Sequence, residues 1–294
     1  MRALLSRTQS FPSFSSHIMS FRPKLKGVPP PPPPPPQPDW VEPEDEQRAS
    51  NGGHGTDDAL GVTKILEESG ITCCFVGISA LIFYGAERVR PDWEICVPTD
   101  LVDKAADILK SEPHSRAYGL VEPWSFPTVS LLHTYSRFKG QGTDFYFILV
   151  PATDVHIICE PENLTRSLRG LPYPKLDVFI QSCLDMGDRL QLCDVIDGTD
   201  LPEQWGEDNL DLDGFNDTEW AKDMNKRGRE YENGKFAHLE PFAWCGPMKR
   251  REMWQSLVRS KKDRLDWTRP SYIFITQYRI RDEPDSWTVL SDMY

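Results

Sequence analysis

The fold is decided by two neighbouring stretches of sequence, CFVGIS at residues 74–79 and RPDWEICV at residues 90–97. The first stretch is apolar and predicts a buried strand, which Gly77 closes at a turn from strand to helix. The second predicts another strand that begins with an acidic pair. Asp92 and Glu94 stand two residues apart, so a strand directs both side chains to the same face of a sheet.

Two carboxylates that lie side by side repel each other, and both stay ionised only in water or around a cation. Mg²⁺ suits such a pair because it is a hard cation that prefers oxygen ligands and is usually held by one or two carboxylates together with substrate phosphates. A two-metal site for phosphoryl transfer needs this clustering of acids. Asp92 and Glu94 are therefore the candidate metal ligands.

These residues resemble the signature of the nucleotidyltransferase superfamily, which has the DNA polymerase β-like fold. The signature is a hydrophobic residue, glycine, then glycine or serine, and after a short gap an Asp-hydrophobic-Asp/Glu motif. Val76 and Gly77 match its opening, and Asp92-Trp93-Glu94 matches the acidic motif. Within the superfamily the chain most resembles fungal members. The resemblance covers about residues 57–160.

The resemblance implies a role for each matching residue. Asp92 and Glu94 would be catalytic metal ligands, and Gly77 and Ser79 would position the phosphates of the nucleotide. A third carboxylate is expected on a later strand, where Asp144 is the first candidate and Asp154 the second. Two departures weaken the match: Ile78 replaces the second Gly or Ser, and Trp93 is bulky for its place.

The implied activity is Mg²⁺-dependent transfer of a nucleoside monophosphate from a nucleoside triphosphate to the hydroxyl of an acceptor that the sequence does not identify. The alternative is a catalytically inactive, nucleotidyltransferase-fold binding or regulatory module. The uncertain third acid favours this alternative. In the simplest interpretation, the acids are solvated or paired with Arg88 or Arg90.

Periodicity and turn residues outline the rest of the chain. Helices are expected over residues 57–70, 79–84, 100–110, 176–191, 218–231 and 248–262. Strands are expected over residues 71–76, 93–97, 117–121, 129–138, 144–150, 155–159 and 272–280. This order predicts an α/β (α+β) fold in which a nucleotidyltransferase-like mixed sheet has flanking helices and carries a C-terminal extension of helices and strands.

Composition divides the chain into three parts. Residues 1–56 form a disordered tail with eight consecutive prolines, Pro29 to Pro36, that favour a stiff polyproline II segment. Residues 57–165 form the core, and residues 166–294 form an extension packed on it. A polyproline-binding partner with an SH3-like groove is one expectation for the proline run, and a plain spacer is the alternative.

Charge and cysteine content exclude several classes of protein. The 294 residues carry a net charge of −12, which disfavours binding to nucleic acid or to anionic membranes. No stretch is long and apolar enough to cross a membrane. Seven cysteines without CxxC spacing indicate a reduced, cytoplasmic protein with no structural zinc site. The Arg- and Ser-rich first 26 residues leave mitochondrial import as an alternative.

Overall fold

The structure is a computed structural model that describes residues 55–86, 88, 90–123, 131–167, 169–234 and 243–261. The proline run and nearly all of the predicted tail lie outside the described residues, as does the strand predicted over residues 272–280. The described residues belong to one compact unit. None of the described helices has the length and apolar character that crossing a bilayer requires.

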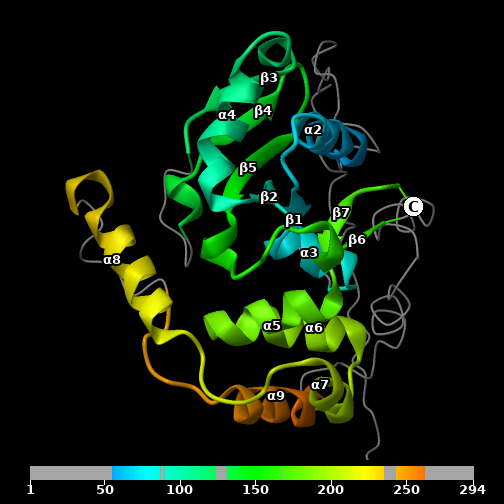
Figure 1. Ribbon diagram of the computed structural model, residues 1–294, viewed down its shortest axis with the longest axis vertical. Helices are drawn as coiled ribbons and strands as arrows, with labels where there is room; N and C mark the ends of the chain where they lie inside the picture. The colour runs from blue at the N-terminus through cyan, green and yellow to red at the C-terminus, as the bar shows by residue number, and fades with distance from the viewer. Residues whose placement is uncertain are drawn as a thin grey trace, which may run out of the picture. The chain divides into compact units, whose positions relative to one another are not determined.

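The core of the fold is a five-stranded mixed sheet (Figure 1). Its strands, in spatial order, are β1 (Cys74–Phe75), β2 (Trp93–Val97), β5 (Tyr146–Pro151), β4 (Arg137–Gly140) and β3 (Tyr118–Val121). Strands β2 and β5 run parallel, and the other three pairs are antiparallel. Together with its flanking helices, this sheet confirms the predicted α+β fold class.

The two central strands are buried, because both faces of the sheet are covered. Residues 147–150 of β5 are all at most 1% exposed, so this strand is a continuous apolar run rather than an alternating one. Strand β2 matches its predicted bounds of 93–97, and only Glu94 within it is not fully buried. Register pairs Trp93 with Phe147 and Glu94 with Ile148.

Three helices flank the sheet in the first half of the chain: α2 (Thr56–Glu68), α3 (Gly77–Phe83) and α4 (Val102–Lys110). Helix α2 buries one apolar stripe, and its N-cap is Gly55. The start of the predicted helix 100–110 is a 3₁₀ turn, η1 (Thr99–Leu101). Further 3₁₀ turns are η2 (His114–Arg116), η3 (Leu132–Thr134), η4 (Ala152–Val155) and η5 (Pro161–Asn163).

The second half is mainly helical, after a two-stranded hairpin of β6 (Leu164–Arg166) and β7 (Pro172–Pro174). Its helices are α5 (Leu176–Met186), α6 (Arg189–Thr199), α7 (Glu203–Asn209), α8 (Thr218–Gly234) and α9 (Arg250–Arg259). Strand β7 contacts β1, and α6 contacts α3, so these elements pack directly on the core. Helices α7 and α9 meet at the buried Trp254, whose indole N–H donates to the carbonyl of Glu203 at 3.1 Å.

The helix predicted over 176–191 is wrong as a single element, because the chain breaks at Gly187. Its φ of 69° is a left-handed conformation that glycine adopts without steric cost. Asp188 then caps α6, since its carboxylate accepts hydrogen bonds from the backbone N–H groups of Leu190 and Gln191. Two helices therefore replace the predicted one.

Two of the predicted strands are also wrong, because one forms only in part and the other does not form. A strand is expected over 129–138, yet within the described residues 131–138 strand β4 begins only at Arg137, and residues 132–134 form the turn η3. The strand expected over 155–159 does not form, because η4 ends at His156 with a φ of 48°. Asp154 within η4 is buried against an arginine from α8, a long-range contact that no local pattern indicates.

Candidate functional site

Glu94 lies against the glycine turn. The backbone N–H of Ile78 donates a hydrogen bond to Glu94 Oε1 at 3.3 Å. A Cβ at Gly77 would lie 2.5 Å from the Glu94 carboxyl carbon, so only glycine lets the turn approach this closely. Burial raises the pKa of Glu94 to about 7, and the charge of Asp92 adds to that rise, while Ile78 N–H and Arg90 oppose it.

Asp92 is held by an arginine from a different strand. Its side chain is 2% exposed and lies just before β2. Arg137, the first residue of β4, binds both of its oxygens, with Nε 2.7 Å from Oδ2 and Nη2 3.1 Å from Oδ1. Such a two-point contact between a guanidinium and a carboxylate is strong and fixes both groups. The acidic pair therefore consists of one half-buried acid at the glycine turn and one acid in a buried ion pair.

The arginines that precede the acidic pair in sequence have other partners. Arg88 binds both carboxylate oxygens of Asp194 in α6, at 2.5 and 2.8 Å. The Arg90 guanidinium stacks over the ring of Trp93, 3.3 Å from its centroid. Trp93 itself is 3% exposed and fills the core, with its ring 4.8 Å from that of Phe75. The bulk of this tryptophan is thus accommodated inside the sheet.

Ser79 is the third residue of α3 and lies inside the fold. The side chain is fully buried, and its hydroxyl has no hydrogen-bond partner among the described residues. A buried hydroxyl without a partner loses its hydrogen bonds to water and gains none in return. The hydroxyl is therefore an unsatisfied polar atom inside the fold.

We expect Ser79→Ala to leave the free energy of unfolding unchanged or to raise it by about 1 kcal/mol, because it removes a buried polar group that lacks a partner. Chemical denaturation of the two proteins measures this difference. Ser182→Ala is the matched control, since the buried Ser182 hydroxyl donates to the Phe179 carbonyl at 2.8 Å and its loss should destabilise the fold. A Ser79→Ala protein less stable than wild type would indicate that this hydroxyl binds a group essential to the fold.

The two candidates for the third carboxylate lie in different surroundings. Asp144 precedes β5, its side chain is 69% exposed, and its closest cation is Lys139 at 4.0 Å. Asp154 is 5% exposed and accepts hydrogen bonds from Tyr135 at 2.5 Å and from Arg227 at 2.7 and 3.1 Å. Register places Tyr146 and Ile148 of β5 beside the acidic pair, so neither neighbouring position on that strand is acidic.

The arrangement does not fit a pair of Mg²⁺ ions. Both oxygens of Asp92 are occupied by Arg137. Across the described residues, neither Asp92 nor Glu94 belongs to a group of three His, Cys, Asp or Glu ligand atoms within 4.8 Å of one another. A two-metal centre needs carboxylates that are shared between the ions and free to bind them.

Gly77→Ala tests the closeness of the glycine turn to Glu94. The turn has a φ of 56°, so we expect alanine to lower the free energy of unfolding by about 2 kcal/mol through backbone strain and displacement of the carboxylate. The matched control is Gly70→Ala, because Gly70 has a φ of 77° but nothing within 4 Å of an added Cβ. Thermal or urea unfolding gives both values. Equal losses in the two variants would mean that Glu94 does not crowd the turn.

Sequence reasoning missed the partners of two candidate acids, Asp92 and Asp154. Arg137 is 45 residues from Asp92, and no motif connects them. Asp154 is bound by Tyr135 and Arg227, which are distant in sequence and which only the tertiary structure brings to it.

Among known proteins, the chain is similar to solved structures, and that similarity is low. No protein-family model matches the chain, and no curated protein matches it. The protein JHP933 from Helicobacter pylori is similar with 11% identity and a TM-score of 0.31, covering 73% of this chain and 94% of its own. Terminal uridylyl transferase 4 from Trypanosoma brucei, with bound CTP, is similar with 12% identity and a TM-score of 0.24, covering 69% of this chain.

This chain spans 61% of the length of that uridylyl transferase chain, and the same enzyme with bound UTP and UMP gives 10% identity and a TM-score of 0.24. These proteins come from a bacterium and a trypanosome, so the resemblance to fungal members stays a prediction. Because identities and TM-scores are this low, the functional conclusion depends on the residues of this chain.

Proposed function

We propose that this chain is a nucleotidyltransferase-like protein that works as a binding or regulatory module without catalysing nucleotidyl transfer. The observation that carries the proposal is the buried, two-point ion pair between Asp92 and Arg137. The guanidinium takes the place at this acid that a metal ion would need. A buried carboxylate already compensated by arginine gains little from a second cation, because the ion pair must first be broken.

The surroundings of the ion pair support the same conclusion. The positions of β5 beside the acidic pair hold Tyr146 and Ile148, and the Tyr146 ring lies 4.5 Å from the Arg137 guanidinium carbon. This ring helps to hold the arginine over the sheet by a cation–π contact. The ligand of the module is a nucleoside triphosphate, as the resemblance implies, bound without a need for Mg²⁺.

A second candidate is the Mg²⁺-dependent transfer of a nucleoside monophosphate to an acceptor hydroxyl. One observation favours it: Glu94, one of the two acids of the motif, lies next to Gly77, which forms the other part of the motif. In this candidate Asp92 and Glu94 are the metal ligands, Gly77 and Ser79 contact phosphates, and Asp144 is the third acid. It requires Arg137 to release Asp92.

Incubation of the full chain with each labelled nucleoside triphosphate, in the presence of Mg²⁺ or Mn²⁺, separates the two candidates. The proposal expects no metal-dependent transfer and a rise in melting temperature with nucleotide that is equal in Mg²⁺ and in EDTA. Transfer that disappears in Asp92→Asn and persists in the control Asp107→Asn, whose carboxylate is exposed and lies outside the site, would reject the proposal and support catalysis by the acidic pair. No nucleotide-dependent shift under either condition would reject nucleotide binding.

A further inference from the structure

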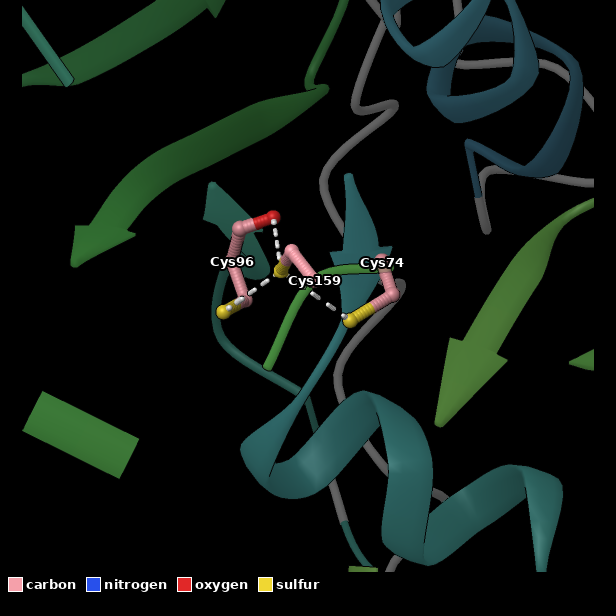
Figure 2. A group of neighbouring side chains, drawn as sticks. All are labelled: Cys74, Cys96 and Cys159. Carbon is pink, nitrogen blue, oxygen red and sulfur yellow. Dashed lines mark hydrogen bonds between the residues drawn. The ribbon is translucent and has the colours of Figure 1, made fainter. Parts of the chain in front are cut away.

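Three cysteines converge at one point beside the sheet (Figure 2). Cys74 on β1 and Cys96 on β2 are cross-strand partners in the antiparallel pair. Cys159, from the segment that follows η4, reaches between them, and dashed lines in Figure 2 join its sulfur to both other sulfurs. All three sulfurs lie within 4.8 Å of one another. The cluster joins segments 22 and 63 residues apart in sequence, and sequence spacing alone did not indicate it.

The distances between the sulfurs are close to those of a metal–thiolate site. The Cys96 and Cys159 sulfurs are 3.3 Å apart, and those of Cys74 and Cys159 are 4.0 Å apart. Thiolates that each lie about 2.3 Å from one metal ion have their sulfurs about 3.8–4.0 Å apart. The observed distances bracket this value, so small side-chain rotations would complete the triangle.

The cluster is buried, so water is largely excluded from it, and its three sulfur atoms are soft ligands. Cys74 and Cys96 are fully buried, and Cys159 is 8% exposed. We propose that Cys74, Cys96 and Cys159 form a binding site for a thiophilic d¹⁰ metal ion, Cu⁺ or Zn²⁺. Soft thiolate ligands select these ions, whereas Mg²⁺ requires oxygen. The site is independent of the acidic pair and of the function proposed for it.

Two features of the cluster favour different members of this class of ions. Among the described residues no fourth His, Cys, Asp or Glu joins the three sulfurs, and Cu⁺ is satisfied by three. Three thiolates around Zn²⁺ leave one net negative charge, compared with two around Cu⁺, and a buried net charge is costly. The number of ligands therefore favours Cu⁺, and the net charge favours Zn²⁺. Titration with each ion shows which of the two binds more tightly.

Other interpretations of the cluster account for fewer of its features. Buried cysteines often act as small apolar side chains, but such packing does not require three sulfurs to face one another. A disulfide between Cys96 and Cys159 would leave Cys74 unused.

The ion would clamp the segment after η4 to the first two strands of the sheet. Because metal ligands must come together in the folded chain, binding adds directly to folding stability. Cys96 lies two residues from Glu94 on the same strand. The metal would therefore fix the strand that carries the candidate site without contributing a ligand to it.

The test uses the full chain, purified under reducing conditions without chelator. Metal content by mass spectrometry, followed by titration of the metal-free protein with Zn²⁺ and with Cu⁺, should give one equivalent per chain and a raised melting temperature for the preferred ion. Cys96→Ser and Cys159→Ser should lose that equivalent. Cys193→Ser is the matched control, because Cys193 lies in α6 outside the cluster, and it should retain the metal.

A second measurement needs no variant and covers the case in which the serine variants do not fold. Co²⁺ added to the metal-free wild-type chain should give the intense near-ultraviolet sulfur-to-cobalt charge-transfer absorption of a multi-thiolate site. Absence of this band, absence of a stoichiometric equivalent of either ion, or retention of the metal by folded Cys96→Ser and Cys159→Ser would each overturn the proposal.

Discussion

Substitution of Arg137 by methionine should lower the free energy of unfolding by about 3–5 kcal/mol. Methionine keeps most of the apolar stem but removes the guanidinium, which leaves the Asp92 carboxylate buried without its partner. A buried charge without compensation is among the most destabilising features that a single substitution can create. Urea denaturation of wild type and Arg137→Met measures the loss.

A double variant shows whether this loss comes from the ion pair. Asp92→Leu combined with Arg137→Met replaces both charges by apolar groups, so stability should return to the wild-type value or exceed it. Arg116→Met is the matched control, because the pair between Arg116 and Glu112 is exposed on both sides and contributes little. If Arg137→Met and Arg116→Met cost the same, the ion pair is not buried in solution and the main support for a non-catalytic module is lost.

Stability should also depend on pH through Glu94. In the unfolded chain this carboxyl ionises near its ordinary pKa of 4.5, whereas in the folded chain its pKa is about 7. Between these values the folded state binds more protons than the unfolded state, so the free energy of unfolding falls as pH rises, and the fall ends above pH 7. The shift corresponds to at most roughly 3 kcal/mol, and to less if water reaches this half-buried side chain.

Glu94→Gln removes this dependence while an amide oxygen can still accept the hydrogen bond from Ile78 N–H. The variant should therefore gain stability over wild type between about pH 5 and 7 and keep that advantage at pH 8. Denaturation curves at several pH values, with the exposed Glu68→Gln as control for the loss of one carboxyl, measure the effect. Parallel pH profiles for wild type and Glu94→Gln would show that Glu94 ionises normally in the fold.

The fold class could be predicted because its strongest signals are local. A strand over 93–97 follows from five consecutive residues, and the turn at Gly77 follows from an apolar run that ends in glycine. Predictions failed where a distant residue overrides local preference. Residues 155–159 have strand-forming composition, yet Asp154 is held by Arg227 and His156 turns the chain, so no strand forms.

The candidate site also has one part that follows from local sequence and another part that depends on distant residues. From the sequence alone, Glu94 could be placed on a strand next to a glycine turn with Asp92 two residues before it, because strand periodicity and the steric freedom of glycine are properties of neighbouring residues. The partners of those acids follow from the tertiary structure. The strand order β2-β5-β4 brings Arg137 to Asp92, and the pairing of β1 with β2 brings three distant cysteines together. These contacts depend on which strands become neighbours, and that choice is made by burial across the whole sheet rather than by any short pattern.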